Sequence, residues 1–126
     1  MYEDIAEEDA WYCVLSVDEA SFDKLDKAWI PEFDTSVSPR KRLWMQTTST
    51  NLDNYIKSLD KSWNPDTTIR LAVMPHGKDR SRTQMLIPPG LVDKVKFHAV
   101  CKEKKDEVKN IPVDYSKFKN VKGKKE

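Results

Sequence analysis

The chain has 126 residues, a length that single domains commonly have, and 38% of them are hydrophobic while 34% are charged. No apolar run approaches the roughly 18 residues of a membrane span, and three glycines are too few for a glycine-rich phosphate loop. The acidic start, Met1 to Asp4, also lacks the basic and apolar regions of a signal peptide, so we expect no membrane contact.

The charges are sorted along the chain, although the net charge is only +1. Residues 1–34 carry eleven Asp or Glu against two Lys, a balance of −9. Residues 35–126 carry twenty Lys or Arg against ten acids, a balance of +10, and all five arginines lie between residues 40 and 82. Such an asymmetry points to charged partners, so we expect a surface that meets an anion, above all nucleic acid.

The beginning of the chain predicts an arm followed by a strand. Residues 1–10 contain five acids and no apolar period, which is typical of a flexible acidic arm. Residues 11–17 are rich in aromatic and β-branched side chains and predict the first strand.

A short amphipathic helix is predicted next. Phe22, Leu25 and Trp29 follow one another at helical spacing, and Pro31 lies beyond the expected end. Either Asp18 or Ser21 is expected to cap its first turn.

The strongest helix signal covers residues 51–63. Apolar side chains recur there at the spacing of one core-facing stripe: Leu52, Tyr55, Ile56, Leu59 and Trp63. The stretch from Thr50 to Asp53 matches a capping box at the start, and Asn64-Pro65 is expected to end the helix.

Strands are predicted on both sides of this helix, at residues 41–47, 67–74, 82–87 and 93–101. Residues 31–39 are expected to form a loop, and residues 75–81 a polar connection between two strands. The sequence Pro88-Pro89-Gly90 predicts a turn in which the glycine has positive φ.

The element order is therefore β-α-β-α-β-β-β. Helices early and strands late favour an α+β two-layer sandwich, with two helices on one face of a mostly antiparallel sheet of about five strands. Three segments are expected: an acidic flexible arm at 1–10, a single α+β domain at 11–101, and a lysine-rich extended tail at 102–126.

The cysteine count predicts the redox compartment. Cys13 and Cys101 are too few for a disulfide framework, and both lie in apolar, strand-like settings where reduced thiols are common. We therefore expect two free thiols and a cytoplasmic or other reducing intracellular location.

A basic and aromatic set is the best functional candidate: Arg40, Lys41, Arg42, Trp44, Arg70, Lys78, Arg80, Arg82, Lys94 and Lys96. If the strands share a sheet, Arg42, Trp44, Arg70 and the two lysines of the last strand would line one solvent-facing surface. Cations neutralise phosphates and an aromatic ring stacks a base, worth about 1–3 kcal/mol per base. The sequence thus predicts a small non-enzymatic protein that binds nucleic acid, with single strands favoured.

Two other interpretations are open. The same charges suit a protein-binding adaptor or inhibitor that docks electrostatically on an acidic partner. A small nuclease would use His76, in a loop with basic neighbours, as a general base. The spacing of His and Cys fits no metal motif, and no cofactor is expected.

Overall fold

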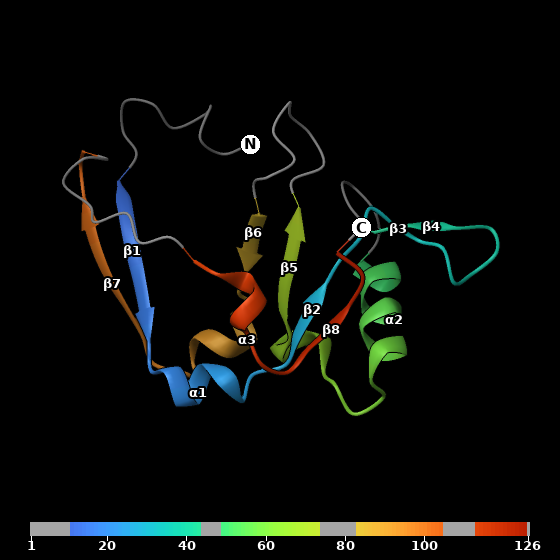
Figure 1. Ribbon diagram of the computed structural model, residues 1–126, viewed down its shortest axis with the longest axis horizontal. Helices are drawn as coiled ribbons and strands as arrows, with labels where there is room; N and C mark the ends of the chain where they lie inside the picture. The colour runs from blue at the N-terminus through green and yellow to red at the C-terminus, as the bar shows by residue number, and fades with distance from the viewer. Residues whose placement is uncertain (1–10, 44–48, 74–82, 105–112, 126) are drawn as a thin grey trace.

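The computed structural model describes residues 11–43, 49–73, 83–104 and 113–125, and its fold is α+β, as the sequence predicts (Figure 1). The elements in chain order are β1 (Tyr12–Val17), α1 (Glu19–Asp23), β2 (Lys27–Trp29), β3 (Phe33–Asp34), β4 (Lys41–Arg42), α2 (Ser49–Leu59), the 3-10 helix η1 (Pro65–Thr67), β5 (Ile69–Val73), β6 (Thr83–Leu86), α3 (Pro89–Val92), β7 (Phe97–Lys102), the 3-10 helix η3 (Tyr115–Lys117) and β8 (Val121–Gly123). The described strands form one four-stranded sheet and two two-stranded sheets, instead of the single sheet that we expected.

The four-stranded sheet has the order β6-β5-β2-β8. β5 runs antiparallel to β6, whereas β2 is parallel to both β5 and β8. This sheet is therefore mixed, although three of the five strand pairings among the described residues are antiparallel. Long connections that contain helices separate β2 from β5, and such connections permit parallel pairing where a tight hairpin would not.

Both faces of this sheet are covered. On one face Ala28 lies in the same buried cluster as Ile56 of α2. On the other face Ile69 lies in a cluster with Leu91 of α3, against which Phe22 of α1 packs. Successive strand residues point to opposite faces, so these strands supply two cores. The expected two-layer sandwich with helices on one face is thus replaced by helices on both faces.

The first predicted helix is correct only in its first half. The carboxylate of Asp18 accepts a hydrogen bond from the Ser21 N–H at 3.0 Å and caps α1. The helix ends at Asp23, and Trp29, expected on its apolar stripe, belongs to β2. Both Phe22 and Trp29 pack against the core around Ile69. The spacing of these apolar residues therefore identified side chains that pack against the core, but it did not identify one continuous helix.

The second predicted helix is confirmed in its core-facing stripe, since Tyr55, Ile56 and Trp63 are all buried. It starts at Ser49, one residue before the predicted cap Thr50, and it ends at Leu59. A turn then brings Trp63 into the same core.

The strand predicted at 41–47 forms only β4, and residues 44–48 lie outside the described residues. β4 pairs antiparallel with β3, which lies within the predicted loop 31–39. The structure also replaces the predicted turn at residues 88–90 by the start of α3. Gly90 is not at positive φ there; a Cβ at this position would come within 2.4 Å of the Asp66 carbonyl oxygen.

The described part of the predicted tail belongs to the fold. β8 pairs with β2 at the edge of the four-stranded sheet, and Phe118 and Val121 pack against the core around Ile69. Residues 113–125 are therefore not an extended tail. Their apolar side chains are too widely spaced to show a period in the sequence.

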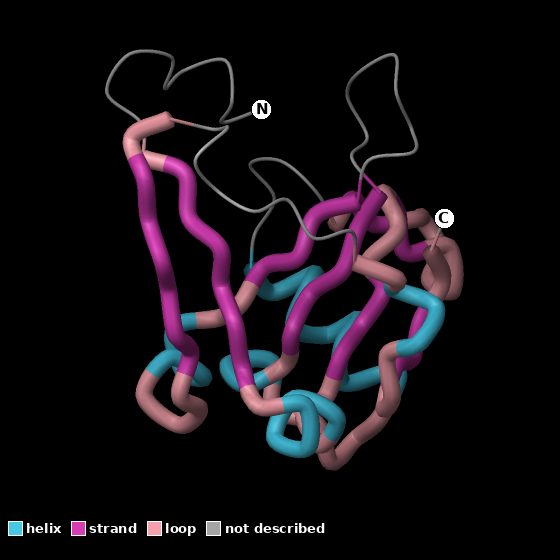
Figure 2. Tube along the Cα trace, turned by 60° about the vertical axis from the view of Figure 1, so that its left-hand side comes forward, coloured by secondary structure: helices cyan, strands magenta, loops and turns pink. Residues whose placement is uncertain are grey.

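β1 and β7 pair with each other alone among the described strands and form an antiparallel ribbon. Figure 2 shows this ribbon standing apart from the four-stranded sheet. The register sets Cys13 directly opposite Cys101, with their Cα atoms 4.0 Å apart, and a disulfide joins them. The expectation of free thiols is therefore wrong, because the pairing of two strands 88 residues apart could not be foreseen from the spacing of the cysteines.

Within the described ranges, no helix is long and apolar enough to cross a membrane.

Candidate functional site

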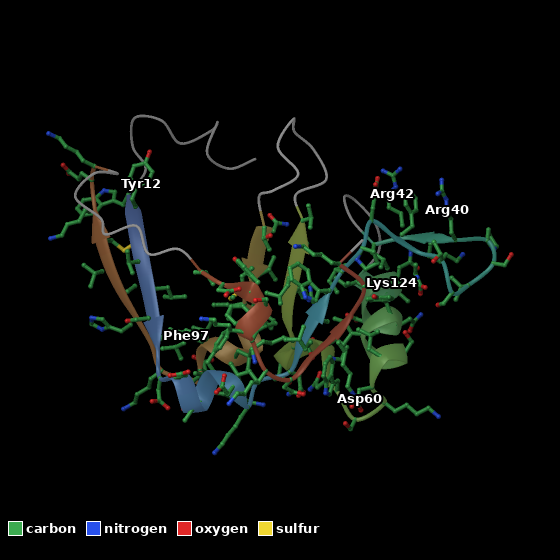
Figure 3. The ribbon with its side chains drawn as sticks, viewed as in Figure 1. Tyr12, Arg40, Arg42, Asp60, Phe97 and Lys124 are labelled. Carbon is green, nitrogen blue, oxygen red and sulfur yellow. A yellow bond between two sulfur atoms is a disulfide. The ribbon has the colours of Figure 1, made fainter. Side chains whose placement is uncertain are left out.

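Three of the predicted cations lie together at the β3–β4 hairpin. Arg40, Lys41 and Arg42 are all exposed on it. The guanidinium carbons of Arg40 and Arg42 lie 4.0 and 5.1 Å from the centre of the Phe33 ring. Figure 3 shows both arginines on the hairpin at one end of the molecule. We call residues 33–42 the basic hairpin.

The acid within the basic hairpin is withdrawn from its surface. Asp34 is buried, and its carboxylate accepts a hydrogen bond from the Ser36 N–H at 3.0 Å and another from the Ser36 hydroxyl. Arg40 and the two cations of β4 therefore have no carboxylate within salt-bridge distance among the described residues. Nothing in the described part of the chain therefore neutralises these charges.

The base of the hairpin is fixed to the core. The Leu43 side chain is buried beside α2, and its N–H donates to the Glu32 carbonyl oxygen at 2.9 Å. The Asn51 side-chain amide of α2 donates to the Arg42 carbonyl oxygen at 3.3 Å. These contacts hold the backbone that carries the arginines.

α2 also ties the end of β8 to the neighbourhood of the hairpin. The Tyr55 hydroxyl donates to the Trp29 carbonyl oxygen and accepts from the Lys124 N–H, each at 3.3 Å. Burial raises the pKa of Tyr55 above its ordinary value. Because Asn51 and Tyr55 are one helical turn apart, Arg42 and the exposed Lys124 attach to adjacent turns of α2 (Figure 3).

Arg70 does not join this group. It lies on β5 opposite Ala28 and is half-buried, and its Nη2 donates to the Pro65 carbonyl oxygen at 3.4 Å. Its Nε is buried without a hydrogen-bond partner among the described residues. The side chain is therefore mainly turned into the protein and does not line an open basic face.

Lys94 and Lys96 are exposed, but they lie just before β7. Figure 1 shows the β1–β7 ribbon and the basic hairpin at opposite ends of the long axis. The single surface expected to contain Arg42, Arg70 and both lysines is therefore not formed. Four predicted site residues, Trp44, Lys78, Arg80 and Arg82, and the proposed base His76 lie outside the described residues.

Within the described part of the chain, the basic hairpin brings three exposed cations together. No cluster of three or more His, Cys, Asp or Glu side chains among them could hold a metal ion. The acid with the most strongly lowered pKa is Asp60, which is held below its ordinary range by hydrogen bonds from Lys122 and then Ser62. Lys122 is thereby neutralised by an ion pair of 2.6 Å.

The chain matches one protein family, whose function is unknown. A family model described as a family of unknown function (DUF5910) matches residues 1–124. The chain belongs to DUF5910. Searches of curated proteins and of solved structures found no match.

In this DUF5910 member, sequence reasoning missed two parts of the site. Phe33 lies in a segment expected to be a loop, and only the register of β3 on β4 brings it opposite Arg42. Lys124 lies in the predicted tail and reaches α2 only because β8 joins the sheet. The run Arg40-Lys41-Arg42 was the one signal visible in the sequence, and the structure places it at β4 of the basic hairpin.

Proposed function

We propose that the protein binds nucleic acid, single strands by preference, through the basic hairpin and without cleaving it. The observation that carries the proposal is the group Arg40, Lys41 and Arg42, exposed on a short hairpin whose own carboxylate is buried. Phosphate contacts by Arg and Lys supply most of the affinity of non-specific nucleic-acid binding.

The geometry around Phe33 supports a preference for single strands. The ring is in cation–π range of two guanidinium groups, which limits the freedom of both arginines. A guanidinium plane can stack on an unpaired base while its N–H groups bond to phosphate. A duplex keeps its bases stacked inside, so it would use only the charge.

The test compares two double variants with equal charge changes. Arg40→Gln with Arg42→Gln removes the cations on Phe33, and Lys94→Gln with Lys96→Gln removes two exposed cations far from the hairpin. Binding is measured by fluorescence anisotropy with labelled single-stranded and duplex oligonucleotides over a range of salt concentrations.

We expect the arginine variant to bind single strands more weakly and to lower the slope of log K against log salt by about 1.4, or roughly 0.7 per phosphate contact. The lysine variant should keep the slope of the parent protein. The oligonucleotides should be recovered uncut. Equal losses in both variants, or no binding at low salt, would contradict the proposal.

The cysteine pair bears on location. Disulfides persist in oxidising compartments and are rare where thiol reductants are abundant. Because Cys13 and Cys101 are bridged, we propose that the protein works in a compartment where this bond is kept, and not in the reducing one predicted from the sequence.

A further inference from the structure

The β1–β7 ribbon has a free edge on β7. Because the Cα atoms of Cys13 and Cys101 are only 4.0 Å apart, this is a non-hydrogen-bonded pair of the antiparallel ladder. Hydrogen-bonded and non-hydrogen-bonded pairs alternate, so Leu15 and Ala99 form another pair of the same kind. The backbone N–H and C=O groups of Phe97, Ala99 and Cys101 therefore point away from β1.

Nothing among the described strands pairs with that edge. Figure 1 shows β7 as the outer strand of the ribbon, with β1 between it and the rest of the protein. Ala99 is exposed, and the side chain of Val100 is 48% exposed. β7 contains no proline and pairs with β1 in continuous register without a bulge, so within the described part of the chain nothing blocks this edge from another strand.

Lysines flank the apolar centre of this edge on both sides. Lys94 and Lys96 precede β7, Lys102 ends it and Lys104 follows, and all four are exposed; the exposed acids Asp93 and Glu103 lie among them, so each flank keeps one positive charge in excess. If β7 paired with β7 of a second copy about a two-fold axis at Ala99, Lys96 would lie opposite Lys102. Like charges directly opposite destabilise a strand pair, so a second copy is disfavoured.

We propose that the β7 edge binds an extended segment of a partner protein by strand addition, and that this segment has an apolar centre with acidic residues at both ends. The backbone of Phe97, Ala99 and Cys101 supplies the hydrogen bonds, and the flanking lysines select the charge. This surface lies at the other end of the molecule from the basic hairpin, so the inference does not depend on the proposed function.

The first experiment uses two short synthetic peptides of alternating valine and threonine. One has a pair of glutamates at each end, and the other has a pair of lysines at each end. Isothermal titration calorimetry with the oxidised full-length chain at low salt should give a dissociation constant at least about tenfold lower for the glutamate peptide, since exposed opposite charges each add a few-fold.

The second experiment removes one edge hydrogen bond. Ala99→Pro deletes an N–H that faces away from β1 and should weaken binding of the glutamate peptide by about tenfold. Leu15→Pro is the matched control, because the Leu15 N–H faces the opposite edge of the ribbon. Circular dichroism and the absence of free thiols check that both variants keep the ribbon.

A third variant keeps the test decisive if either proline disturbs the ribbon. Lys96→Gln with Lys102→Gln should bring the affinities for the glutamate and lysine peptides within about threefold of each other. The inference is overturned if the glutamate peptide does not bind, if both peptides bind the parent protein equally, or if polyglutamate without the apolar centre binds as well. It is also overturned if sedimentation shows a dimer that Ala99→Pro dissociates, because the edge would then hold a second copy.

Discussion

The side chain of Lys27 is fully buried, with a relative exposure of 0%. Its Nζ donates to the carbonyl oxygens of Phe22, Leu25 and Lys119 at 2.7, 2.9 and 2.8 Å, and it lies 4.5 Å from the centre of the Phe22 ring. Burial lowers the pKa of Lys27, while Asp23 and then Asp26 act in the opposite direction. One ammonium group thus joins the end of α1 to the segment before β8.

Replacing Lys27 by Met should lower the free energy of unfolding by about 2–3 kcal/mol, because buried carbonyl oxygens lose their donor. Lys24→Met is the control, since Lys24 is exposed nearby and should change stability by less than about 0.5 kcal/mol. Denaturant melts of both variants provide the comparison. Equal effects would mean that the three hydrogen bonds of Lys27 contribute nothing net.

Asp60 should give the protein part of its sensitivity to acid. Hydrogen bonds from Lys122 and Ser62 hold its pKa well below the ordinary value of 3.8. A carboxyl whose pKa is lowered by folding stabilises the protein above the unfolded value, and this stabilisation is lost as the pH falls through the folded value. Asp60→Asn should therefore lose less stability than the parent protein between about pH 5 and pH 2.

Substitutions at Lys122 test whether this lysine causes the lowered pKa of Asp60. Lys122→Met should raise the pKa of Asp60 in an NMR titration, because it removes the largest contribution to the shift. Lys61→Met removes a neighbouring exposed lysine and should leave that pKa where it is. A shift of similar size in both variants would point to general charge and not to the ion pair.

At the scale of elements, regular local patterns were predictable and long-range pairings were not. The core-facing stripe of α2 was predicted correctly because it lies on one continuous helix face, and β5 lies within the strand predicted at residues 67–74. β3 and β8 have only two and three residues, too few to show a period, and both lie outside the predicted strands. They become strands only through partners elsewhere in the chain, as β8 does on β2.

The candidate site also has features that the sequence predicted and features that depend on long-range strand pairing. The cationic run Arg40–Arg42 is local and was visible in the sequence. Its ring, Phe33, depends on hairpin register, and its separation from Lys96 depends on β7 pairing with β1 and not with β5 or β6. The alternation of apolar and polar residues in a strand predicts which side chains share a face, but it does not predict which sheet the strand joins.

The C-terminal segment offers a matched pair of substitutions that tests its place in the core. Val121 packs against the core around Ile69, whereas Val113 is 54% exposed. Val121→Ala should lower the free energy of unfolding by about 1–2 kcal/mol, and Val113→Ala by less than about 0.5 kcal/mol. Thermal or denaturant melts measure both. A neutral Val121→Ala would return this segment to the extended tail predicted from the sequence.

Over the whole molecule, the asymmetry of charge in the sequence persists only in part. The acidic α1 lies toward the lower end of the ribbon, and the basic hairpin projects from the other end of the long axis (Figure 1). However, Lys94 and Lys96 bring positive charge to the ribbon end. Among the described residues, positive charge is therefore found both at the basic hairpin and beside β7, at opposite ends of the molecule.

The disulfide should contribute strongly to global stability. Titration of the unreduced, unfolded protein should find no free thiol. The bridge joins residues 88 apart, and constraining a loop of that length in the unfolded chain is worth about 4–5 kcal/mol in the chain-entropy model. A dithiol reductant should lower the melting temperature of the parent protein, and it should have no effect on the variant Cys13→Ser with Cys101→Ser. Full recovery of both thiols without reductant would contradict the bridge.

The bridge also determines how the protein would respond to a pull on its two ends. β2, β5 and β6 lie within the covalent ring closed by Cys13 and Cys101, whereas β8 lies outside it. Tension applied at the termini would pass through the sulfur atoms, so it could peel β8 from β2 but could not draw out the enclosed strands. Cutting the bridge would release the 88-residue span, adding up to about 300 Å of extensible chain. The disulfide thus limits how far the oxidised protein extends under force. The pairing of β8 with β2 is the part of the four-stranded sheet that breaks first.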